Sequence, residues 1–138
     1  MTLVTTSRRS TPLIRSIAKD LAFAMECSYI SRGKRGLRDI ADEHEYFIVV
    51  EQHKGDICLV LYHEHAPVLC RIITECEPGI REQGLCRGIV TSDKVLAETL
   101  PPCCRVQYKP EKNLYVSFDG PQKRSMRLII SPGEIHAA

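Results

Sequence analysis

Residues 29–38 read Tyr-Ile-Ser-Arg-Gly-Lys-Arg-Gly-Leu-Arg and place four cations beside two glycines. Glycine lets the backbone bend sharply and come close to a ligand, because it has no Cβ. The cations supply positive charge at that bend, which suits a polyanion such as RNA. They are Arg32, Lys34, Arg35 and Arg38. The alternative interpretation is a solvated basic turn.

A second basic segment, residues 5–11, lies between a short β-prone run and a helix predicted to begin at Pro12. Thr11 is a good N-cap, and proline suits the first helical position. The first turn of a helix presents unpaired N–H groups and a partial positive charge, which would hold a phosphate. Arg8 and Arg9 add guanidinium groups that bind phosphate in a bidentate manner. The alternative is that the hydroxyls only cap the helix and the arginines only face solvent.

Two further groups of cations extend this pattern. Arg15 and Lys19, four residues apart, fall on one face of the predicted helix. Arg127, beside the last predicted strand, alternates with apolar residues, so we expect its side chain on the solvent face. There it would either widen the basic patch or protect an edge strand from aggregation. The predicted RNA-binding residues are Arg8, Arg9, Arg15, Lys19, Arg32, Lys34, Arg35, Arg38, Lys123, Arg124 and Arg127.

The charge of the chain is unevenly distributed, although its net value is only +2. Residues 1–38 hold eight Lys/Arg against two acids, giving +6, and residues 39–83 hold three against ten, giving −7. Residues 84–138 hold eight against five, giving +3. Such asymmetry predicts a polarised molecule with one face suited to anions.

The sequence contains no common enzyme motif: no Gly-x-Ser-x-Gly, no His-Glu-x-x-His and no Gly-x-x-x-x-Gly-Lys-Ser/Thr. His63 and His65 would share a face of a strand, with no third metal ligand evident, so a polar turn before Pro67 is the favoured interpretation. Seven cysteines, an odd number without Cys-x-x-Cys spacing, are expected as reduced, buried thiols. We therefore expect no catalysis, no metal or other cofactor, and no small-molecule substrate.

The periodicity of apolar residues predicts an α/β fold that positions these cations. A helix is expected to run from Pro12 to about Met25, and a short one over residues 37–44. Strands are expected over residues 3–6, 28–31, 46–51, 57–63 and 68–75, with a turn at residues 54–56. Residues 77–84, which contain Pro78, Gly79 and Gly84, are the expected junction.

After this junction the order of elements begins again. We expect a strand over residues 88–92 that ends in a helix cap, a helix over 93–100, and strands over 104–108, 114–118 and 126–130. Both parts run strand, Thr-Ser, helix and further strands. We interpret this as a degenerate duplication, with two similar halves of mixed sheet and helices at about 1–78 and 84–138.

The composition, 43% hydrophobic and 26% charged over 138 residues, is that of one soluble globular domain. The N-terminal residues lack the apolar stretch of a signal peptide, and the longest apolar runs are only as long as strands. We therefore expect a cytoplasmic protein that does not enter a membrane.

Several stretches resemble the opening of Brix-domain proteins, and the short archaeal members fit best. They are Thr5-Thr6-Ser7-Arg8, residues 15–21, residues 29–34 and Leu37-Arg38-Asp39-Ile40. Phe118-Asp119-Gly120 and residues 127–130 are compatible with the same family. The resemblance spans nearly the whole chain as a single Brix domain, and its specific motifs lie in the first forty residues.

The resemblance implies a role in ribosome biogenesis, in which the protein binds precursor ribosomal RNA and assists rRNA processing or subunit assembly. It also implies other ribosome assembly proteins as partners, and two halves that each resemble the anticodon-binding domain of class IIa aminoacyl-tRNA synthetases. Three alternatives remain open: a scaffold whose basic face meets an acidic protein, an anticodon-type tRNA-binding module, and a thiol or metal enzyme.

Overall fold

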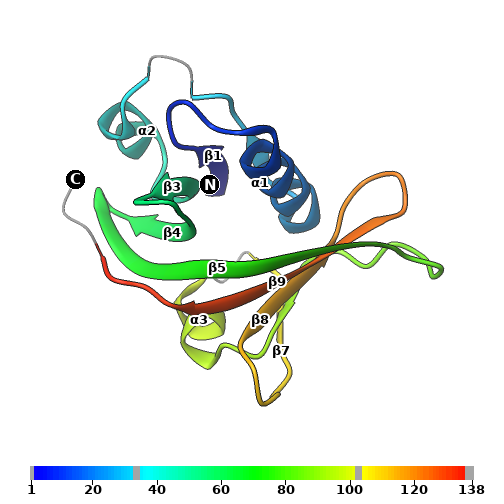
Figure 1. Cartoon of the computed structure of the whole chain (residues 1–138). Helices are drawn as coiled ribbons and strands as arrows, with labels where there is room; N and C mark the ends of the chain where they lie inside the picture. Colours follow the sequence, from blue (N-terminus) through cyan, green and yellow to red (C-terminus); the bar gives the residue numbers. More distant parts are fainter. Residues whose placement is uncertain (1, 33–34, 102–103, 136–138) are drawn as a thin grey trace.

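The computed structural model describes residues 2–32, 35–101 and 104–135 of the chain. Within these residues, three helices pack on one mixed sheet of nine strands, in the order β2-β1-β3-β4-β5-β9-β8-β6-β7 (Figure 1). The first elements are β1 (Thr2–Thr6), α1 (Pro12–Met25), β2 (Ser28–Tyr29), α2 (Leu37–Glu43), β3 (Tyr46–His53), β4 (Asp56–His63) and β5 (Ala66–Ile80). Those that follow are β6 (Ile89–Thr91), α3 (Lys94–Thr99), β7 (Val106–Tyr108), β8 (Tyr115–Asp119) and β9 (Arg124–Pro132). None of these helices is long and apolar enough to cross a membrane. The predicted α/β class is confirmed.

Helix α1 begins where the sequence predicts. The Thr11 side chain accepts a hydrogen bond from the Ile14 amide at 3.3 Å, and Pro12 is the first helical residue. The helix ends at Met25, and Glu26 caps it. The left-handed backbone of Glu26 (φ 56°) allows its N–H group to donate hydrogen bonds to the carbonyls of Ala22 and Phe23. The apolar face of α1 is buried, and Asp20 is buried with it.

The strands of the first part have apolar side chains on both faces, because a helix covers each face. Val4, Ile48 and Leu61 belong to the core cluster that contains the buried face of α1. Their strand neighbours, such as Phe47 and Val60, belong to a second cluster with the buried residues of α2. Figure 1 shows α1 and α2 on either side of these strands. Alternate residues of each strand therefore pack against different helices.

The two parts differ in the direction of one strand. The first two strands of each part are parallel, β1 with β2 and β6 with β7. In the first part β3 is also parallel to β1, because the connection from β2 to β3 is long and contains α2. In the second part only residues 109–114 separate β7 from β8, and β8 runs antiparallel to β6. No helix equivalent to α2 is found among the described residues of the second part.

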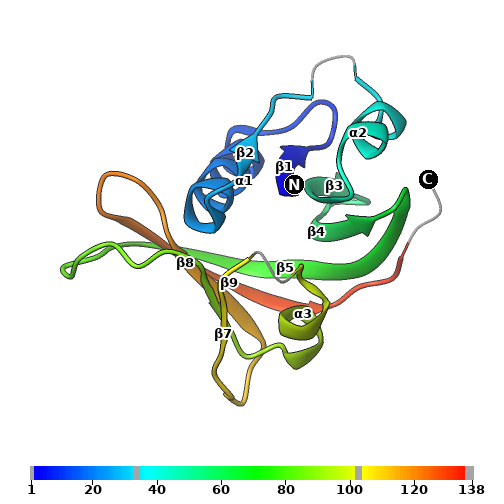
Figure 2. The same cartoon turned by 180° about the vertical axis from the view of Figure 1, so that it is seen from behind.

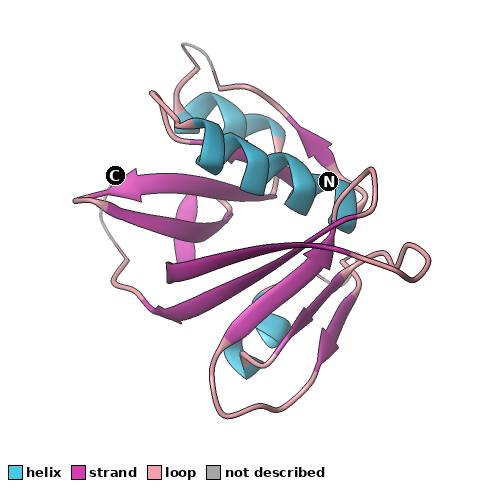
Figure 3. Ribbon diagram, turned by 45° about the vertical axis from the view of Figure 1, so that its right-hand side comes forward, coloured by secondary structure: helices cyan, strands magenta, loops and turns pink. Residues whose placement is uncertain are grey.

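Strand β5 is much longer than the sequence predicts. It was expected to end at residue 75, before the junction, but it continues to Ile80 and pairs with β9 over residues 71–80. Pro78 and Gly79 are tolerated because β4 pairs with β5 only as far as Ile73, so the later residues have a strand on one side only. Figure 3 shows the long strands twisting through the middle of the curled sheet.

A buried ion pair joins β5 to the start of α3. Arg71 and Asp93 are 9% and 3% exposed, and the guanidinium binds both carboxylate oxygens. Asp93 also caps α3 by accepting a hydrogen bond from the Leu96 amide at 3.1 Å. Burial alone would raise the pKa of Asp93, but the hydrogen bonds from Arg71 and Leu96 hold that pKa below its ordinary value.

Candidate nucleic-acid interface

Two loops that follow neighbouring parallel strands meet at one end of the sheet. Val4 of β1 lies opposite Tyr29 of β2, so the chain leaves both strands at the same edge (Figure 2). A Cβ placed on Gly36 would lie 4.0 Å from Arg8 Nη2. Arg8 also lies close enough to Arg32 for its charge to affect the pKa of that residue. The fold therefore gathers cations that are far apart in the sequence.

Arg32 is partly buried, and the charge of Arg8 acts on it. Burial, followed by the positive charge of Arg8, lowers the pKa of Arg32, and Tyr62 and Glu51 oppose that shift only in part. Arg32 Nε donates a hydrogen bond to the Arg35 carbonyl at 3.1 Å, which fixes the guanidinium. The like charges of Arg8 and Arg32 repel each other, and a bound polyanion would relieve that repulsion.

The other predicted cations of these loops have different surroundings. Arg9 is exposed and has a left-handed backbone, with φ 58°, and Arg38 is exposed on α2. Arg35 Nη2 lies 2.9 Å from Glu43 Oε2, in an ion pair on the surface. Lys34 lies outside the described residues. We call Arg8, Arg9, Arg32, Arg35 and Arg38 the loop cations, and we include Arg38 because it lies in the first turn of α2, directly after the loop.

Three more cations line a depression of about 470 Å³ beside α1. Arg15 and Lys19 stand on α1, and Arg124 begins β9. Arg124 binds the Asp20 carboxylate through Nε at 3.2 Å and Nη2 at 2.9 Å, and this hydrogen bonding raises the pKa of Arg124. The Asp20 side chain is 3% exposed, so its carboxylate anchors Arg124 from within the protein. We call Arg15, Lys19 and Arg124 the helix-side cations.

Arg127 is not gathered with these groups. Its guanidinium carbon lies 4.1 Å from the centre of the Tyr115 ring, and its Nη2 lies 3.1 Å from Glu111 Oε2. It lines a groove of about 670 Å³ that contains none of the other predicted cations that the structure describes. The expected alternation is confirmed, since Met126 and Leu128 are buried. Lys123 is exposed in the turn between β8 and β9, directly before Arg124 in the sequence.

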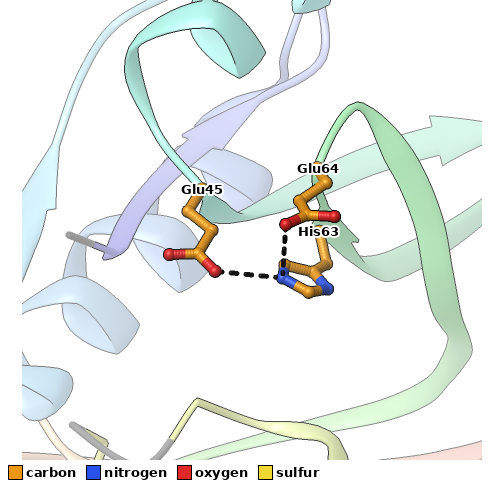
Figure 4. Close-up of side chains that lie close together, drawn as sticks. All are labelled: Glu45, His63 and Glu64. Carbon is orange, nitrogen blue, oxygen red and sulfur yellow. Dashed lines mark hydrogen bonds and ion pairs between the residues drawn. The ribbon is translucent and has the colours of Figure 1, made fainter.

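The turn between β4 and β5 separates two histidines that were expected to share a face. Glu64 and His65 have φ values of 49° and 73°, so His65 turns away and its Nε2 lies 2.8 Å from Asp42 Oδ1. His63 Nε2 instead lies 3.2 Å from Glu45 Oε1 and 3.9 Å from Glu64 Oε1 (Figure 4). The favoured interpretation, a polar turn before Pro67, is therefore confirmed, because residues 64–65 form the turn between β4 and β5. The sequence did not reveal that Glu45 and Glu64 lie beside His63. The hydrogen bond from the Glu64 amide to the Glu45 carbonyl, 3.0 Å long, holds this exposed corner together, and we assign the three side chains a structural role.

The six cysteines within the described residues are free thiols, and Cys103 lies outside them. Cys58 and Cys70 are buried side by side, and burial, reinforced by this neighbour, raises the pKa of Cys58 to about 12. The prediction of buried thiols is confirmed for this pair. Cys27, Cys76 and Cys104 are only partly buried, and the prediction is wrong for Cys86, which is exposed.

Sequence reasoning missed how Arg124 is anchored. Its partner Asp20 lies 104 residues away. A Cβ on Gly120 would lie 2.6 Å from Asp20 Oδ2, so the β8–β9 hairpin approaches α1 closely only because this residue is glycine. The available signal was Asp20 itself, since a carboxylate among the buried residues of a helix requires a partner.

No family model matches the sequence, and no curated protein matches it significantly. Among solved structures, the crystal structure of Mil, an archaeal Imp4-like protein, is similar with a TM-score of 0.63 and 20% sequence identity. The match covers 99% of this chain and 100% of Mil. The two proteins therefore share a fold over almost their whole length.

Proposed function

We propose that this protein is a Brix-domain ribosome biogenesis factor that binds precursor ribosomal RNA through the loop cations. The observation that carries the proposal is the meeting of two loops at one end of the sheet, where Arg8 Nη2 would lie 4.0 Å from a Cβ on Gly36 in the loop that follows Arg32. The likeness in fold to an Imp4-like protein, a member of the Brix-domain group, supports the same assignment.

The chemistry of the loop cations supports recognition of the RNA backbone. Among the described residues, no carboxylate lies within ion-pair distance of these cations except at Arg35. Guanidinium groups bind phosphate oxygens in a bidentate manner, and RNA helices are recognised mainly through shape and backbone. The sequence has only five Tyr, three Phe and no Trp, so we expect little stacking on bases.

The proposal extends to the cellular role. The protein would act in the cytoplasm, assist rRNA processing or subunit assembly together with other assembly proteins, and catalyse no reaction. The two parts would be halves of one Brix domain, each related to the anticodon-binding domain of class IIa aminoacyl-tRNA synthetases. The first two strands of each part are parallel, which supports this relationship. However, β3 is parallel to β1 whereas β8 is antiparallel to β6, which indicates that the halves have diverged.

A titration with a structured rRNA fragment tests the proposal. Replacing Arg8 and Arg32 by Gln should raise Kd roughly tenfold or more at about 0.1 M salt, because two phosphate contacts are lost. The slope of log K against log salt should fall by about two units. The double variant Lys109→Gln/Lys112→Gln, with the same change in net charge, is the matched control and should bind almost normally. Binding by the intact protein that does not respond to salt would overturn the proposal.

A further inference from the structure

We propose that the depression lined by the helix-side cations is a phosphate-binding site, through which one RNA contacts both α1 and the β8–β9 hairpin. This inference rests on the proposed function and adds a second contact region beyond the loop cations. Its lining holds three cations and one carboxylate, a surplus of two positive charges. A phosphodiester group carries one negative charge and would reduce that surplus.

Arg124 is prepared for such a ligand by its partners. A guanidinium has five N–H donors. Asp20 takes one from Nε and one from Nη2, and Gln122 Oε1 takes one from Nη1 at 3.1 Å. Two N–H groups therefore remain, on a side chain that is 45% exposed. A donor that is already fixed in place loses little conformational freedom on binding.

The two cations on α1 complete the lining. Arg15 Nη1 donates to the Ser10 carbonyl, which holds its guanidinium beside the start of the helix. Lys19 Nζ lies 5.7 Å from the centre of the Tyr29 ring. Among the described residues, no carboxylate lies within ion-pair distance of either cation. Their charge is therefore available to an anion from outside the protein.

The depression is formed by a specific fit between α1 and the hairpin. The buried Asp20 carboxylate and the absence of a side chain at Gly120 bring the hairpin against the helix. A simple link between these elements would need only Asp20 and Arg124. Arg15 and Lys19 add repelling charge at the same place, and a phosphate would offset that repulsion.

The depression lies beside α1, the helix that directly follows the loop of Arg8 and Arg9. Arg15 lies in the first turns of the helix that follows Arg8 and Arg9. An RNA strand bound at the end of the sheet would therefore reach the depression by following α1. This continuity favours the phosphate of a nucleic acid over an isolated anion.

Replacing Arg15 and Lys19 by Gln tests the site, because the change leaves the Asp20–Arg124 pair intact. Binding of the rRNA fragment should weaken roughly tenfold, and the salt slope should fall by about one unit, as expected for one lost phosphate contact. The control is again Lys109→Gln/Lys112→Gln, and thermal unfolding should show that all variants fold. In a second measurement, made with Cys86→Ser to remove the exposed native thiol, a photoreactive aryl azide on Lys19→Cys should crosslink to the RNA, whereas the same group on Lys112→Cys should not.

The outcomes separate the two proposals. If Arg8→Gln/Arg32→Gln weakens binding but Arg15→Gln/Lys19→Gln weakens it no more than the control, the phosphate site is refuted and the proposed function stands. An intact protein that does not bind the rRNA fragment refutes both.

Discussion

Replacing Arg71 by Met should destabilise the protein strongly, because it leaves the Asp93 carboxylate buried without its cation. The two side chains are only 11% and 4% exposed, so solvent cannot replace the lost partner. Breaking one side of such a pair costs about 3–5 kcal/mol, a large part of the 5–15 kcal/mol typical of a folded domain. Methionine is similar in size, so the loss reports the unpaired charge more than a cavity.

The loss of stability in Arg71→Met should depend on pH, in a direction set by the pKa of Asp93. In the intact protein the hydrogen bonds from Arg71 and Leu96 outweigh burial and keep the pKa of Asp93 below its ordinary value of 3.8. The pair therefore adds stability above that pH, and the stability is lost as pH falls through the lowered pKa. Without Arg71, burial dominates and raises the pKa of Asp93. As pH falls, protonation of Asp93 removes the unpaired buried charge from the variant. The loss of stability caused by Arg71→Met should therefore be smaller at about pH 4 than at about pH 7.

Urea unfolding at both pH values, followed by circular dichroism, measures the deficit. Asp93→Asn keeps an N-cap for α3 and removes the charge, so Arg71→Met/Asp93→Asn should be more stable than Arg71→Met alone. A deficit below about 1 kcal/mol, or one that is equal at both pH values, would refute the reasoning.

Two further predictions concern packing and thiol chemistry. Gly120→Ala should lower the free energy of unfolding by about 1–3 kcal/mol, because the added Cβ would lie 2.6 Å from Asp20 Oδ2. In the same urea assay the control Gly84→Ala should be nearly neutral, since a Cβ there would have no atom within 4 Å. At pH 8 the exposed Cys86 should react with iodoacetamide roughly a hundredfold faster than Cys58, which is buried and has a pKa of about 12. Mass spectrometry measures both alkylation rates, and equal rates would contradict the assigned burial.

Local features of this fold could be predicted from the sequence because they depend on neighbouring residues. Thr11 and Pro12 marked the start of α1, since a cap and a fixed φ act within one turn. The sequence predicts the turn between β3 and β4 at residues 54–56, and the φ values of Lys54 and Gly55, 51° and 87°, suit a tight hairpin.

Features that depend on distant partners could not be predicted. Pro78 and Gly79 normally indicate the end of a strand, but pairing with β9 on one side only allows β5 to continue through them. The anchoring of Arg124 by Asp20 required the hairpin and α1 to meet in space. Likewise, Arg127 and Arg124 are both basic residues beside the last predicted strand, and only the fold places Arg127 beside Glu111, away from the other cations.

Crosslinking in living cells tests the central claim most directly, with the attached RNA sequenced and the attached peptides identified. We predict that precursor ribosomal RNA is recovered, and that its crosslinks map to the segments around Arg8 and Arg32. Recovery of no ribosomal RNA, or crosslinks confined to the groove around Arg127, would contradict the account.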